Sequence, residues 1–328
     1  MKFNKKVFLN TLILLFIFSY LLAVPGAVKS QEVGAILVAH GSKNQAWNDD
    51  NKEIKDLYDD IKNEISPLKL VYLRFDNAKK LEVVTANMKN SGVRKIQFVH
   101  LSPSSYSVRH QEIDEVVSPL LPDDQYEYGI VAMDDHPKIV EILKIYADEL
   151  SEDPKKESLI LVGYGATYEL NNKAWIKQLE NIGKVIHGEL KFKEIVCMTL
   201  RYHAADSLRS QAVENLRIET RRLMDKGKVL VVPYVMCQGS FQEDLKFYLK
   251  EYLEGNDPPV GICMKGVIDH DNTKAWVREV INNVRSGGAL PKIKTVNSSW
   301  SAMDAEIGGN KKHEYGHAEK KVITTTPK

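Results

Sequence analysis

Residues 35–42, AILVAHGS, decide the fold of this 328-residue chain. Five apolar residues in a row are typical of a parallel strand buried on both faces, and the glycine after them allows a tight turn. Residues 159–166, LILVGYGA, repeat this order. An amphipathic segment follows each opening, at residues 51–65 and 171–182. The two openings therefore indicate two α/β units of the same kind.

The similarity between the two halves continues along the chain. Residues 68–78, LKLVYLRFDNA, resemble residues 195–205, IVCMTLRYHAA, and residues 92–100 correspond to 227–233. Apolar runs that alternate with helical segments predict parallel sheets with right-handed crossovers. We therefore expect a duplicated α/β fold, with two three-layer α/β/α domains that each hold a parallel sheet of about four strands.

The amino-terminal segment has the pattern of a signal peptide. Three lysines precede an uncharged stretch from residue 7 to 28, which Pro25 and Gly26 interrupt. This predicts export, for example to the periplasm, and no membrane span in the mature form; an uncleaved anchor is the alternative, because about 20 apolar residues can cross a bilayer. The predicted regions are a signal peptide (1–30), an amino-terminal α/β domain that holds the active site (31–150), a structural carboxy-terminal α/β domain (151–285) and a flexible polar tail (286–328).

The composition excludes several classes of protein. Lys and Arg number 45 against 44 Asp and Glu, hydrophobic residues make up 43% and charged residues 27%. These values exclude a disordered chain, a fibre and a polytopic membrane protein, and they predict no nucleic-acid partner. The three cysteines form no CxxC pair, which argues against a zinc ribbon or a cysteine-bound iron–sulfur cluster; a disulfide stays open.

Two histidines of the first half are the main candidates for chemistry. His40 follows the first predicted strand, at the edge of a parallel sheet where ligands bind. His110 lies in residues 98–115, near the start of a predicted helix from which it could point back toward His40. The second half has Tyr164 in place of His40 and no histidine in residues 232–245. We therefore expect one active site, in the first half.

The chemistry of such a site follows from the imidazoles. Two of them suit divalent cobalt, nickel, iron or zinc, and they also suit proton transfer near neutral pH. The sequence has no P-loop, GxGxxG, GxSxG or HExxH motif, so no nucleotide cofactor is expected. His100 is expected to be structural, and His313 and His317 to lie in a solvated tail.

Several of these segments resemble the sirohydrochlorin chelatases of the CbiX type, within the class II tetrapyrrole chelatases. The likeness spans about residues 33–284. The matching pieces are ILVAHGSKNQAWND (36–49), LSPSSYSVRHQEI (101–113), DDHPKIVEIL (134–143), TLRYHAADSLRSQAVENLR (199–217) and VVPYVMCQGSFQEDL (231–245).

The resemblance implies insertion of Co²⁺, or else Fe²⁺ or Ni²⁺, into a tetrapyrrole of the sirohydrochlorin type, for cobalamin or sirohaem synthesis. The metal is a substrate, and the protein would be a monomer or homo-oligomer. His40 and His110 would be metal ligands, at least one of them accepting a pyrrole proton, and Glu112 or Asp114 would orient His110 or relay protons. The ring would contact Gly41, Ser42, Ser104 and Ser105.

Two departures keep other functions open. The family's G-x-H in the second-histidine loop is replaced by Ser105, Tyr106 and Ser107, and an export signal is unusual in this family. The alternatives are a non-catalytic periplasmic protein that binds tetrapyrrole, haem or metal on the same fold, and a scaffold or partner protein.

Overall fold

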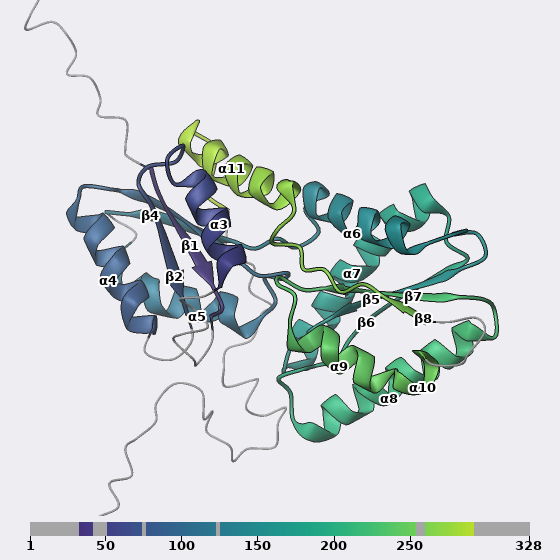
Figure 1. Ribbon diagram of the computed structural model, residues 1–328. Coiled ribbons are helices and arrows are strands. Elements are labelled where there is room, and N and C mark those ends of the chain that lie inside the picture. The colour runs from purple at the N-terminus through teal and green to yellow at the C-terminus, as the bar shows by residue number, and fades with distance from the viewer. Residues whose placement is uncertain (1–32, 42–50, 74–76, 123–124, 254–259, 292–328) are drawn as a thin grey trace, which may run out of the picture.

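The computed structural model describes residues 33–41, 51–73, 77–122, 125–253 and 260–291. They form two parallel sheets of four strands each (Figure 1). In their order across the first sheet, the strands are β2 (Leu68–Tyr72), β1 (Val33–Ala39), β3 (Lys95–Leu101) and β4 (Glu127–Val131). Those of the second sheet are β6 (Glu194–Thr199), β5 (Ser158–Gly163), β7 (Val229–Tyr234) and β8 (Val260–Ile262).

The two sheets have the same strand order, which confirms the predicted duplication. The central strands β1 and β5 carry the two apolar runs that opened each half, and both are buried along almost their whole length. A strand covered on both faces needs apolar side chains on both. The glycine turns after them also correspond, because Gly41 and Gly165 have φ values of 71° and 77°.

Helices cover both faces of each sheet. Those before the second sheet are α3 (Lys52–Ile61), α4 (Asn77–Asn90), α5 (Val108–Val117), the 3₁₀ turn η1 (Ser118–Leu120) and α6 (Pro137–Leu150). The others are α7 (Glu169–Leu190), α8 (Asp206–Met224), α9 (Ser240–Tyr248), α10 (Lys250–Leu253) and α11 (Asp271–Arg285).

The last helix of each half covers the sheet of the other half. Helix α6 packs on β7 and α7, whereas α11 crosses back to β1, β3 and α3 (Figure 1). Arg278 of α11 forms a two-pronged ion pair with Glu64, and Lys274 pairs with Asp60 of α3 at 2.5 Å. The domain boundaries drawn from the sequence stay predictions. The sequence did not predict that the two halves exchange their last helices.

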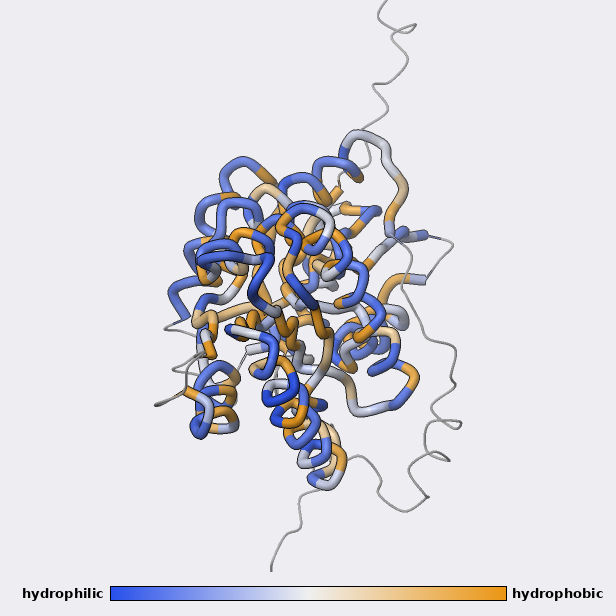
Figure 2. Tube along the Cα trace, turned by 90° about the vertical axis from the view of Figure 1, so that its right-hand side faces the viewer, coloured by the Kyte–Doolittle hydropathy of each residue, from blue (hydrophilic) through white to orange (hydrophobic). Residues whose placement is uncertain are grey.

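The exchange gives the two halves a shared core. One hydrophobic cluster contains Leu37 of β1, Leu161 of β5 and Trp276 of α11, all fully buried. Two further hydrophobic clusters lie beneath the outer helices, one in each half. Hydrophobic and hydrophilic residues alternate along the helices in Figure 2, as expected of helices that bury one face.

The predicted signal peptide, residues 1–30, and His313 and His317 of the tail lie outside the described residues. Within the described part, no helix is long and apolar enough to cross a membrane. Cys197, Cys237 and Cys263 are free thiols.

Candidate functional site

The carboxyl ends of the two sheets meet where the halves contact each other. Tyr234, the last residue of β7, donates a hydrogen bond of 2.7 Å from its hydroxyl to the carbonyl of Asp134, which follows β4. Ligands of parallel α/β sheets bind at such edges. A ligand site of this fold is therefore expected at the junction between the halves.

His40 directly follows β1 and is half-buried. The left-handed backbone of Gly41 turns the chain immediately afterwards. The ring of His40 stacks on the ring of His203, with centroids 6.3 Å apart and planes at 26°. His203 lies in the loop between β6 and α8, so the second half supplies a neighbour of His40 that the sequence analysis did not include.

Aromatic rings of the second half pack against His203. Tyr164 stacks on it with centroids 6.0 Å apart and planes at 11°, and Tyr202 meets it edge-on at 5.5 Å. Phe241 packs against Tyr164 at 4.4 Å. Burial raises the pKa of Tyr164 well above its ordinary value, so its phenol is neutral. These rings form an uncharged wall beside the two imidazoles.

His110 meets another histidine. Its Nδ1 lies 3.3 Å from Nδ1 of His100 on β3, and both side chains are 1% exposed. One nitrogen must donate and the other accept, so the pair shares one proton at this contact. Burial, and then the nearby His110 and His40, hold the pKa of His100 well below its ordinary value. In the structure His110 therefore contacts His100, and His40 contacts His203.

The carboxylates near His110 have partners of their own. Both oxygens of Glu112 accept hydrogen bonds from Arg109 at 2.5 Å, and Asp114 accepts one of 2.8 Å from the hydroxyl of Tyr128. Their predicted support of His110 stays a prediction.

The two serines predicted to contact a ring fasten a loop. Ser104 donates from Oγ to Oε1 of Gln178 on α7 at 2.6 Å, and Ser105 donates from its backbone N–H and its hydroxyl to Asp134 at 2.8 and 2.9 Å. Gln178 donates in return to the carbonyl of Pro103. The loop between β3 and α5 is therefore bonded to the second half. Ser42 lies outside the described residues.

No known protein family and no curated protein matches the sequence. The solved structures that match the fold include two of a sirohydrochlorin chelatase. The sirohydrochlorin chelatase SirB from Bacillus subtilis subspecies spizizenii in complex with cobalt has a TM-score of 0.56 and 13% identity, over 78% of this chain and 96% of that one. SirB from Bacillus subtilis with Fe³⁺ has a TM-score of 0.55 and 16% identity, over 78% and 98%. The chain has the chelatase fold.

A transcription-regulator-like protein from Staphylococcus haemolyticus aligns less well, with a TM-score of 0.40 and 10% identity over 81% of this chain and 98% of that one. At the identities of the two chelatases, the likeness defines the fold. The assignment of chemistry depends on the side chains at the junction of the two sheets.

His203 was not predicted from the sequence, because its counterpart in the first half is Asp76, which bears no imidazole. One signal was available. His203 follows β6 by four residues and so lies at the same carboxyl edge as the residues after the other strands. What the sequence does not contain is the relative placement of the two edges.

Metal binding at the junction would involve few protein ligands. Among the described residues, no three His, Cys, Asp or Glu side chains gather as a set that could hold an ion. Two imidazoles would leave most coordination positions open, which suits an ion that must be passed on.

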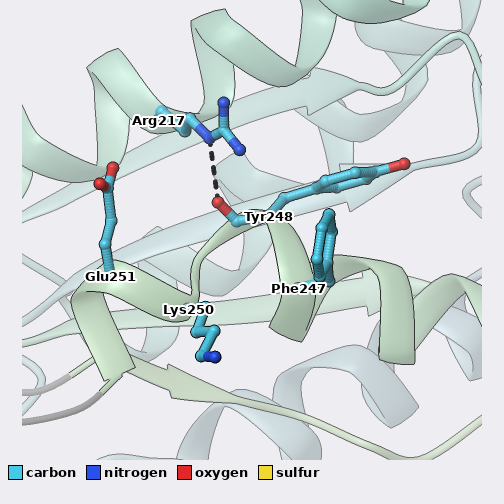
Figure 3. Close-up of a pocket in the computed structure, with 5 residues that line it drawn as sticks. All are labelled: Arg217, Phe247, Tyr248, Lys250 and Glu251. Atoms are coloured by element: carbon cyan, nitrogen blue, oxygen red, sulfur yellow. Dashed lines mark hydrogen bonds between the residues drawn. The ribbon is translucent and has the colours of Figure 1, made fainter.

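A hollow of about 410 Å³ lies elsewhere, on the second half between α8, α9 and α10 (Figure 3). Arg217 donates from Nε to the carbonyl of Tyr248 at 3.0 Å beside it, and Phe247 is 70% exposed. Its lining residues, completed by Lys250 and Glu251, include no imidazole or thiol. We therefore place the candidate site at the junction of the sheets.

Proposed function

We propose that this protein is a chelatase that inserts Co²⁺ or Fe²⁺ into a tetrapyrrole of the sirohydrochlorin type. One observation carries the proposal: the half-buried imidazole of His40 stands at the carboxyl end of β1, at the junction of the two sheets. The fold similarity to structures described as SirB with cobalt and with Fe³⁺ supports it.

The reaction needs a weak metal ligand and a base. When a divalent ion enters a free macrocycle, two pyrrole nitrogens lose their protons, so two protons leave as one ion arrives. A neutral imidazole can serve both needs in turn, because the lone pair that held the ion is free for a proton once the ion has moved to the ring. In this proposal His40 holds the metal and then accepts one of the two protons, and water accepts the other.

The remaining assignments come from the resemblance. The resemblance names His110 as the second metal ligand with Glu112 in support, an assignment that the burial of His110 does not favour. The ring would contact Gly41, Ser42, Ser104 and Ser105. Residues 1–30 would direct export. Mass spectrometry of the secreted protein tests that last point, since cleavage at the predicted site leaves a chain that begins with Gln31.

The first prediction concerns His40→Ala. We expect this variant to lose metal insertion and to keep its fold, because the side chain stands at a strand end and not within the core. The measurement is anaerobic absorbance of sirohydrochlorin with Co²⁺ or Fe²⁺, using protein purified after expression of the full-length chain.

The control is His187→Ala, which removes an exposed histidine from α7. It should insert metal at the wild-type rate. Insertion by His40→Ala at the wild-type rate would refute the proposed role of His40.

A second candidate function has an observation in its favour. His110, the second ligand implied by the resemblance, is 1% exposed and contacts His100. A protein whose site offers His40 while His110 stays buried could bind a tetrapyrrole or a metal without joining them. Ring binding without conversion above the protein-free rate would support this carrier and exclude the chelatase.

A further inference from the structure

His110 and His203 are the two candidates for a second imidazole beside His40, and they differ in their burial. The Nε2 atom of His110 has almost no solvent-accessible area, and its Nδ1 faces His100 at 3.3 Å. The side chain of His110 therefore turns both ring nitrogens away from solvent. His203 is exposed in its loop, and its ring already faces His40.

The separation of the two rings suits a shared ion. A metal–imidazole bond is about 2.0–2.1 Å long, so two rings that bind one ion through one nitrogen each have centres roughly 5–6.5 Å apart. The centroids of His40 and His203 are 6.3 Å apart. The ring planes lie at 26° in a stacked arrangement, so the side chains must rotate before one nitrogen of each ring points at a common ion.

The backbone around His203 is held in place. Arg201, with a φ of 47°, donates from Nη2 to the carbonyl of Thr167 at 2.6 Å and forms an ion pair with Glu169. Thr167 donates from its hydroxyl to the carbonyl of His203 at 3.4 Å. The loop that carries His203 is thus fastened to the start of α7.

An aromatic wall stands beside the two imidazoles. Tyr164 lies nearly parallel to His203, at 11°, and contributes a neutral ring. A flat, uncharged surface beside the imidazoles matches a planar conjugated macrocycle better than a compact polar substrate. Both features come from the second half of the chain.

We propose that His203, and not His110, is the second imidazole of the metal site, so that the ion is held between the two halves. This inference rests on the proposed function only in treating the ion as a substrate. A site of two neutral imidazoles favours Co²⁺, Fe²⁺, Ni²⁺ or Zn²⁺ over Mg²⁺ and Ca²⁺, and its open positions let the ion leave for the ring.

The test is titration of the metal-free protein with Co²⁺, followed by its visible absorbance. We expect His40→Ala and His203→Ala each to weaken Co²⁺ binding at least about tenfold, since even indirect partners of a metal ligand are worth that much. His110→Gln, which keeps a polar side chain toward His100, and the control His187→Ala should bind within about twofold of wild type. Far-ultraviolet circular dichroism verifies the fold of each variant.

A second readout counts the ligands. Electron spin-echo modulation of bound Cu²⁺ detects imidazole nitrogens, and we expect two imidazoles in the wild type and one in His203→Ala. Two imidazoles in His203→Ala and one in His110→Gln would overturn the inference, and so would wild-type protein that binds no Co²⁺.

The outcomes also separate this inference from the proposed function. Loss of Co²⁺ binding in His203→Ala together with no metal insertion by the wild type would retain the site and reject the chelatase. Metal insertion by the wild type with unchanged Co²⁺ binding in His203→Ala would retain the chelatase and reject His203 as a ligand.

Discussion

His100 and His110 form a buried imidazole pair that makes the stability of the protein depend on pH. Protonation of both rings would place two positive charges beside each other, away from water, so the folded state resists the second proton. Burial is the main reason that the pKa of His100 lies well below its ordinary value, and His110 and His40 add to it. The unfolded chain has no such restriction.

Stability should therefore fall as the pH drops below about 6.5, the pKa of an exposed histidine. The unfolded state takes up a proton there that the folded state does not, which costs about 1.4 kcal/mol per pH unit for one proton. We predict that His100→Gln loses less stability than the wild type between pH 6 and pH 5, by about this amount. Urea unfolding at the two pH values measures the difference.

His187→Gln is the matched control, because it removes an exposed histidine and should leave the pH dependence of the wild type unchanged. Equal losses in the wild type and in His100→Gln would show that His100 carries no such effect.

The sequence predicted that His40 follows a strand at the edge of the first sheet, which is where it lies, and it gave no role to His203. His40 could be predicted because the rule for parallel strands depends on one strand and the residue after it. His203 approaches His40 from the other half, at a distance that no local pattern encodes. The inward direction of His110 also depends on how α5 lies on β3, because a helix position alone does not specify what the side chain meets.

At the scale of elements, the glycine turns after β1 and β5 shape the carboxyl edges of the sheets. Gly165 has a φ of 77°, and a Cβ added there would lie 2.6 Å from both Cβ of Thr199 and Oδ1 of Asn172. No side chain can adopt this position without strain and without displacing β6.

We predict that Gly165→Ala lowers the free energy of unfolding by about 2–4 kcal/mol, from backbone strain and the two close contacts. Gly188→Ala is the control, because Gly188 lies in α7 with open space around it. Alanine favours a helix, so that variant should gain about 0.5–1 kcal/mol. Equal unfolding midpoints in urea for the two variants would contradict the prediction.

The elements themselves were largely predictable. The apolar runs that begin at residues 35, 159 and 229 form β1, β5 and β7, because strands buried on both faces need continuous apolar sequence. The sequence could not predict which of the two sheets each helix covers. Helix α11 has a buried face with Trp276 and Ile281, and such a face matches either sheet equally well in sequence.

At the scale of the whole molecule, the shared core joins the two halves into one unit. Removal of either half would expose the apolar face that α6 or α11 covers in the other. The exposed ion pairs that α11 forms with Asp60 of α3 and with Glu64 beyond it contribute little by comparison, because solvent screens them.

We therefore predict that the halves unfold together. Native-state hydrogen exchange should give the amides of β1 and β5 the same free energy of opening, with the same dependence on urea. Exchange of β1 at clearly lower urea than β5 would instead indicate halves that unfold independently.

The exchange of helices also orders events during synthesis. The ribosome finishes the first sheet at Val131, but α11, which covers it, ends at Arg285. At 5–20 residues per second, translation of the intervening chain takes on the order of ten seconds. During that time the nascent first half presents an uncovered apolar surface to chaperones, and its own fold is completed only by the end of the polypeptide.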